Sequence, residues 1–129
     1  MEMMEMDKRL CIECIKAIER IKFSESIEDE NTIGYIDDNN RHIKVLYLED
    51  NIGKYIALAF TAVKKDNIQS VSKELSRRII NGRFEVCEDV VILSSIFPIL
   101  DTQFLYKQIE HALLEIWDMN NIIENAPLD

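Results

Sequence analysis

The stretch from residue 32 to residue 63 constrains the fold of this chain more than any other part of the sequence. Three runs rich in β-branched and aromatic residues, at 32–36, 41–49 and 55–63, have the composition of β-strands. Between the first two runs stand only Asp and Asn residues, at 37–40, and these residue types tolerate the left-handed backbone of tight turns. The second break, at 50–54, contains a glycine. We therefore expect an antiparallel meander of three strands.

The last of these strands has two apolar faces. Side chains alternate across a strand, so Ile56, Leu58 and Phe60 share one face and are expected in the core, together with Leu113 of a later helix. The other face is mostly apolar too, although a solvated sheet face is normally polar. Its residues are Tyr55, Ala57, Ala59 and Thr61.

The neighbouring strand extends this second face in one of two ways, because a shift of one residue exchanges the two faces of a strand. A bulged turn at Gly53 adds Ile43, Val45 and Tyr47, whereas a plain two-residue turn adds Leu46 and Leu48. In either case a helix of this chain, a second subunit or a partner protein should cover the face. The candidate partner-binding residues are Tyr47, Tyr55, Ala57 and Ala59.

Helices are expected before and after the meander in the sequence. Residues 3–23 are predicted to be helical and residues 24–31 to form a loop. The apolar side chains of this helix recur every three or four residues, at Cys11, Cys14, Ile15, Ile18 and Ile21. A second helix is expected to open at Asp66 or Asn67 and to close at Gly82. Its apolar stripe is Ile68, Val71, Leu75 and Ile79.

Two further strands, at 83–86 and 90–96, precede a last helix that Asp101 caps and that ends near Asn125. The predicted fold is a single α+β domain, residues 1–129. It has a mainly antiparallel five-stranded sheet and three helices, in the order α-β-β-β-α-β-β-α.

The charge of the chain limits its partners. Fifteen basic residues stand against twenty-four acidic ones, and the net charge is -9. Nucleic-acid binders carry a basic stripe that neutralises phosphates. We therefore expect no nucleic-acid partner, and instead a basic segment of a partner protein.

The sequence contains no run of about 18 apolar residues, so no membrane-spanning helix is predicted. The N-terminus is acidic where a signal peptide is basic, so a cytoplasmic location is expected, with the three cysteines reduced.

The chain contains cysteines and histidines, which often serve in catalytic or metal sites, but their spacing and position together match no known motif of such sites. Cys11 and Cys14 form C-x-x-C inside a predicted helix, not at its N-terminus, where a thiol pKa is lowered. A zinc site needs about four ligands, and Cys87, His42 and His111 match no ligand spacing. No nucleophile elbow, dinucleotide fingerprint or P-loop is present. We expect no catalytic residue, no metal and no cofactor, and hence no enzyme.

The segment around residues 82–118 carries a family resemblance. Gly82-Arg83-Phe84-Glu85-Val86 leads to Val90-Val91-Ile92-Leu93-Ser94-Ser95, and Phe97-Pro98 and Asp101 then open a helix bearing Leu105, Ile109 and Leu113-Leu114. With the preceding elements, this order of strand, proline-containing break and long helix resembles the type III secretion chaperone-like fold. It is most similar to the YbjN-like branch of that fold, the bacterial sensory transduction regulators.

The resemblance implies a dimeric, non-enzymatic protein without cofactors, which binds an extended segment of another protein as a chaperone or regulator. The alternative function is that of an immunity or stress protein that neutralises a basic partner, which the acidity of the chain also suits.

Overall fold

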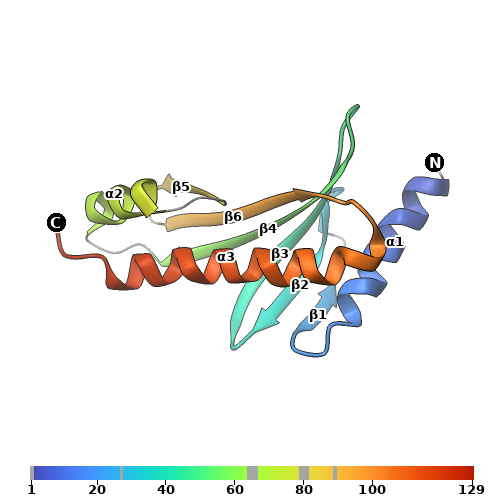
Figure 1. Cartoon of the computed structure of the whole chain (residues 1–129), viewed down its shortest axis with the longest axis horizontal. Coiled ribbons are helices and arrows are strands. Elements are labelled where there is room, and N and C mark those ends of the chain that lie inside the picture. Colours follow the sequence, from blue (N-terminus) through green and yellow to red (C-terminus); the bar gives the residue numbers. More distant parts are fainter. Residues whose placement is uncertain (1, 27, 64–66, 79–81, 89) are drawn as a thin grey trace.

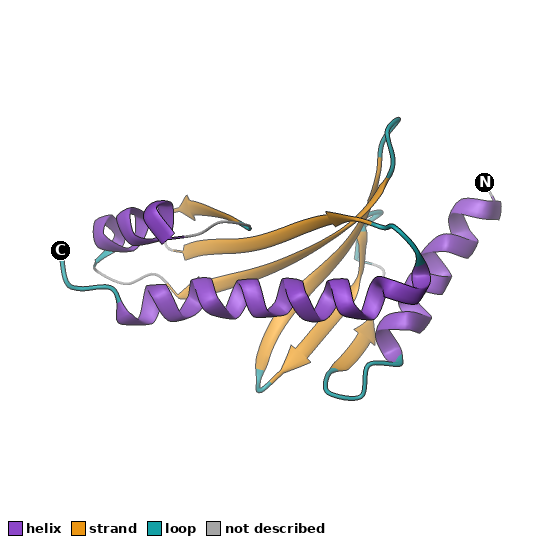
Figure 2. Ribbon diagram, viewed as in Figure 1, coloured by secondary structure: helices purple, strands orange, loops and turns teal. Residues whose placement is uncertain are grey.

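One antiparallel sheet of six strands forms a layer, and the helices pack together on one of its faces (Figures 1 and 2). The computed structural model describes residues 2–26, 28–63, 67–78, 82–88 and 90–129. The elements in chain order are α1 (Glu2–Lys16), β1 (Lys22–Glu25), β2 (Thr32–Asp38), β3 (Arg41–Glu49), β4 (Lys54–Val63), α2 (Ile68–Arg78), β5 (Arg83–Cys87), β6 (Val90–Pro98), the 3-10 turn η1 (Thr102–Phe104) and α3 (Leu105–Asn125). The strand order in the sheet is β1-β2-β3-β4-β6-β5.

The α+β class and the antiparallel sheet are therefore confirmed, but the prediction of five strands is wrong. The predicted helix at 3–23 ends at Lys16, and part of the expected helix and loop forms the edge strand β1. Short turns link the two, in which the Ile18 N–H donates to the Ile15 carbonyl and the Ile21 N–H to that of Ile18. Both isoleucines remain buried, because turns of three residues keep the helical spacing that the sequence shows.

A glycine in β2 lets β1 approach the sheet. A Cβ atom at Gly34 would lie 2.4 Å from the Phe23 ring and 2.4 Å from the Ser24 carbonyl oxygen, closer than atoms can come. Glu25 then joins β1 to α1, since its carboxylate accepts hydrogen bonds from Arg9 at 2.8 Å and Lys16 at 3.0 Å. These contacts join residues 9 to 16 positions apart, beyond the spacing of helical or strand periodicity, which explains why the local pattern did not predict the strand.

The two turns of the meander follow the chemistry of their residues. Asn39 and Asn40, with φ of 53° and 65°, form a two-residue hairpin turn between the paired residues Asp38 and Arg41. In the second turn the Asp50 carboxylate accepts the N–H groups of the residues two and three positions later, and Glu49 pairs with Lys54. Four residues thus separate the paired strands, and this even number places Leu46 opposite Ala57.

The core lies between the sheet and α3, which runs across the front of the sheet in Figure 1. Leu58 and Leu113 are buried, as predicted, whereas Phe60 is half-buried and packs against the core. The buried residues of α3 are Leu105, Ile109, Ala112, Leu113, Ile116, Met119, Asn120 and Ile123. Each buried leucine or isoleucine contributes about 1.5–3 kcal/mol, so this stripe is a main source of stability.

The C-terminal tail holds α2 in place. The Asn67 carbonyl accepts the first helical hydrogen bond of α2, from Val71, as expected of an N-cap residue, and the Asn67 side chain donates to the Ala126 and Pro127 carbonyls. The Asp129 carboxylate accepts the Gln69 and Ser70 N–H groups at 3.2 and 2.7 Å. A residue 59 or 60 positions away in sequence therefore caps this helix.

The remaining predicted boundaries agree closely with the structure. Asp101 accepts the Gln103 N–H at 3.0 Å and so caps the 3-10 turn η1, whereas the N-cap residue of α3 itself is Phe104, three residues later than predicted; α3 ends at Asn125, as expected. Gly82 has a φ of 86°, the left-handed conformation expected of it, although α2 ends at Arg78. The predicted roles of Asp66 and Ile79 concern residues outside the described ranges.

Candidate functional site

The face of the sheet opposite the helices carries apolar side chains in three neighbouring strands, β3, β4 and β6. The register places its side chains in rows across β3, β4 and β6. One row is Leu46, Ala57 and Ile96, and the next is Leu48, Tyr55 and Pro98. Ile96 is 44% exposed, whereas Ala57, with its small side chain between larger neighbours, is only 5% exposed. In the described part of the chain no helix lies over these rows (Figure 2), and we call them the uncovered face.

The structure brings three of the four predicted binding residues together. Tyr55, Ala57 and Ala59 lie on the uncovered face of β4. Tyr47 does not, because it pairs with Ile56 on the covered face and is buried in the core. The turn after Glu49 has four residues and not the two of the alternative that adds Leu46 and Leu48, but its even number gives the same faces, so these two leucines join the uncovered face.

The sequence pattern was not read as placing residues of β6 on the uncovered face, yet the structure puts them there. Ile92 and Ile96 point to this side, beside Thr61 and Ala57 respectively. The signal was present in the sequence, since 90–93 is an unbroken apolar run and such runs are typical of strands that are apolar on both faces.

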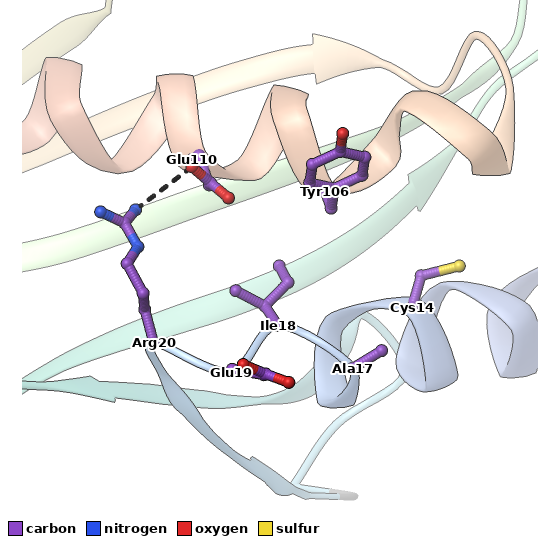
Figure 3. Close-up of a pocket in the computed structure, with 7 residues that line it drawn as sticks. All are labelled: Cys14, Ala17, Ile18, Glu19, Arg20, Tyr106 and Glu110. Atoms are coloured by element: carbon purple, nitrogen blue, oxygen red, sulfur yellow. Dashed lines mark ion pairs between the residues drawn. The ribbon is translucent and has the colours of Figure 1, made fainter.

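A hollow of about 450 Å³ lies on the other side of the sheet, between the end of α1 and α3 (Figure 3). Cys14, Ala17 and Ile18 form its apolar wall, and Tyr106 stands opposite on α3. At its mouth Arg20 lies 3.5 Å from Glu110. The hollow is therefore largely apolar with an ion pair at its rim.

The thiol in this hollow is poorly suited to nucleophilic chemistry. Burial, and secondarily the negative charge of Glu13, raise the pKa of Cys14 above its ordinary value. Burial likewise raises the pKa of Cys87, with Glu85 adding to the effect. A thiol needs to be a thiolate to attack, so a raised pKa lowers its reactivity at neutral pH. No cysteine of this chain lies in a disulfide.

A serine, a glutamate and a histidine meet beside the edge of β6. Ser95 donates a hydrogen bond of 2.9 Å to one carboxylate oxygen of Glu115, and His111 Nε2 lies 3.2 Å from the other. A serine nucleophile needs the imidazole next to its hydroxyl, with the acid behind the imidazole. Here the acid stands in the middle, so the arrangement fixes side chains on α3 and does not activate Ser95.

Within the described ranges no three His, Cys, Asp or Glu side chains are grouped so as to hold a metal ion. None of the described helices is both long and apolar enough to span a membrane. The fold and surface define an α+β protein with an open antiparallel sheet. No family model, no curated protein and no solved structure matches this chain.

Proposed function

We propose that this chain is a non-enzymatic protein-binding module, chaperone-like or regulatory, that holds an extended segment of a partner protein on the uncovered face. The observation that carries the proposal is the row of Leu46, Ala57 and Ile96, which crosses three strands and which no helix of the described residues covers. Contiguous exposed apolar surface on a soluble domain is typical of interaction sites. The small side chains of Ala57 and Ala59 leave room for a flat, extended segment.

The partner segment should be apolar with basic flanks. The chain carries nine more acidic than basic residues, and this excess attracts a cationic segment and speeds its encounter. Lys44, the cation of the next row, lies 3.9 Å from Asp29 and is thereby partly neutralised. The resemblance of the sequence to chaperone-like regulators supports the same kind of partner and adds a homodimer as part of the proposal.

The absence of an activated nucleophile at Cys14 and Ser95 supports the non-enzymatic part of the proposal. Burial raises the Cys14 pKa, and the Ser95 hydroxyl faces a carboxylate.

A synthetic peptide tests the proposal directly. The probe has alternating Leu and Ser residues between pairs of lysines, and its binding is measured by calorimetry at low and high salt. We expect saturable binding that weakens with salt, and about a tenfold or greater loss in Ala57→Lys, because a charge in the centre of an apolar contact is costly to desolvate. Ser76→Lys adds the same charge on the exposed side of α2 and should bind like the wild type.

Light scattering of the same proteins distinguishes a segment of a partner protein from a second copy of this chain as the molecule that binds the uncovered face. A dimer that Ala57→Lys converts to a monomer identifies a second copy of the chain on the uncovered face. Unchanged peptide affinity in a folded Ala57→Lys protein would refute the site. So would a variant that unfolds while Ser76→Lys does not, because the side chain at 57 would then be part of a closed core.

A further inference from the structure

A second hollow on the helix side of the sheet gathers two arginines around Trp117, the only tryptophan of the chain. It has a volume of about 470 Å³ and lies where the segment after α1, the β2–β3 turn and α3 meet. Its lining residues are Arg20, Ile21, Asp38, Asn39, Arg41, Trp117 and Asn121. Such a volume suits a small ligand. The hollow is separate from the uncovered face, so it concerns a property beyond the proposed function.

Trp117 is held in one orientation by two contacts. Its Nε1–H donates to the Asp38 carboxylate at 2.8 Å, and its ring packs edge-on against Phe60 at a centroid distance of 5.2 Å. Because Trp117 is fixed, it forms a rigid platform at the side of the hollow.

Arg41 stacks on this platform. Its guanidinium carbon lies 4.7 Å from the centre of the Trp117 ring. A stacked guanidinium keeps the N–H groups along its edge available for oxygen acceptors, in a fork that matches a carboxylate or a phosphate. No ion pair occupies Arg41 within the described ranges. Its N–H edge is therefore oriented before any ligand arrives.

Arg20 supplies a second cation to the same hollow. Its only described ion pair, with Glu110 at 3.5 Å, is exposed on both sides and so contributes little. Arg20 can therefore turn toward a ligand at small cost. The one carboxylate that lines the hollow, Asp38, already accepts the Trp117 N–H, so the lining carries two cations and one acid.

We propose that this hollow binds the oxyanion group of a small ligand. The Arg41 edge is the main donor, Arg20 the second cation and the Asn121 amide a further polar neighbour. The overall charge of -9 repels anions at long range, so binding depends on this local arrangement. Carboxylate and phosphate share the chemistry that Arg41 recognises, and the experiment separates them.

Trp117 reports on its own pocket. Its fluorescence is measured while sodium phosphate or sodium succinate is added, with sodium chloride keeping the ionic strength constant. We expect a saturable change with at least one of the two, and the tighter one identifies the oxyanion. Replacement of a bidentate charged donor by a neutral one weakens binding about tenfold or more, which is the loss expected for Arg41→Gln. Arg41→Lys keeps the charge without the fork and should fall between.

Arg78→Gln is the matched control, because it removes one positive charge from the exposed face of α2 and should leave the dissociation constant unchanged. The absence of a saturable response with both anions in the wild-type protein overturns the proposal. An unchanged dissociation constant in a folded Arg41→Gln protein does the same. If Arg41→Gln fails to fold by circular dichroism, Arg20→Gln decides instead, since Arg20 is exposed and an unchanged constant there also refutes the pocket.

Discussion

At the scale of single residues, the side of the strand that a residue occupies sets what it contributes. Leu58 and Leu46 are both leucines in the central strands β4 and β3, but Leu58 faces the helices and is fully buried. Leu46 points to the uncovered face and is half-buried. Phe60 lies on the covered face of β4, but it is only half-buried, and its ring contacts Trp117.

Truncation of the two leucines should therefore have unequal effects. We expect Leu58→Ala to lower the free energy of unfolding by about 2–5 kcal/mol, through lost burial and a residual cavity. Leu46→Ala should cost less than about 1.5 kcal/mol, because much of its surface is not buried in the single chain. Urea denaturation at low protein concentration measures both. Equal losses would mean that the core extends to both faces of the sheet.

At the scale of elements, the turns decide how the strands meet. The β2–β3 turn uses Asn39 and Asn40 with both φ angles positive, a conformation that asparagine tolerates and that β-branched residues strongly disfavour. The β3–β4 turn uses the Asp50 carboxylate to hold two N–H groups.

Substitutions at Asn40 should test the first turn. Asn40→Gly is expected to keep or raise the melting temperature, since glycine adopts a φ of 65° without strain. Asn40→Val should lower stability by about 1–2 kcal/mol, the usual cost of a left-handed conformation. Asn51→Val, in the exposed β3–β4 turn, is the control, because Asn51 does not have a positive φ. Thermal melts give the comparison, and equal destabilisation by the two valines would contradict the turn geometry.

At the scale of the whole molecule, three carboxylates accept hydrogen bonds that hold segments of the chain in place. Hydrogen bonds from Lys16 and Arg9 lower the pKa of Glu25, which joins α1 to β1. Backbone N–H groups of Thr32 and Asn31 lower the pKa of Asp29. The Ser70 N–H lowers that of Asp129, which caps α2. All three groups are ionised in the folded chain over a wider pH range than in the unfolded chain.

The fold should accordingly lose stability in acid. A carboxylate with a lowered folded-state pKa stabilises the protein fully above its unfolded pKa, about 4, and this contribution disappears as the pH falls through the folded-state value. We expect Glu25→Gln to be less stable than the wild type at pH 7 and to show a shallower decline between about pH 5 and pH 2. Urea denaturation at several pH values measures this.

Glu49→Gln changes the same charge at the exposed end of β3 and serves as the control for Glu25→Gln. High salt should reduce the difference between the wild type and Glu25→Gln, since the ion pairs of Glu25 are exposed. If the free energy of unfolding changed with pH in parallel for the wild type and Glu25→Gln, the lowered pKa of Glu25 in the folded chain would be contradicted.

The sequence by itself determined the meander, α2, β5, β6 and α3, because alternation, helical spacing and turn residues act between near neighbours. It also determined that β4 is apolar on both faces, which makes Tyr55, Ala57 and Ala59 candidate binding residues. Their shared face follows from the strand period alone.

Only the tertiary structure decided the rest. The strand β1 depends on Gly34 and on Arg9, and the place of Tyr47 depends on the parity of a turn. The hollow that Arg20, Arg41 and Trp117 line depends on the hydrogen bond from Trp117 to Asp38, 79 residues away. That all the described helices gather on one face of the sheet follows from packing between distant segments, which no local pattern of residues encodes.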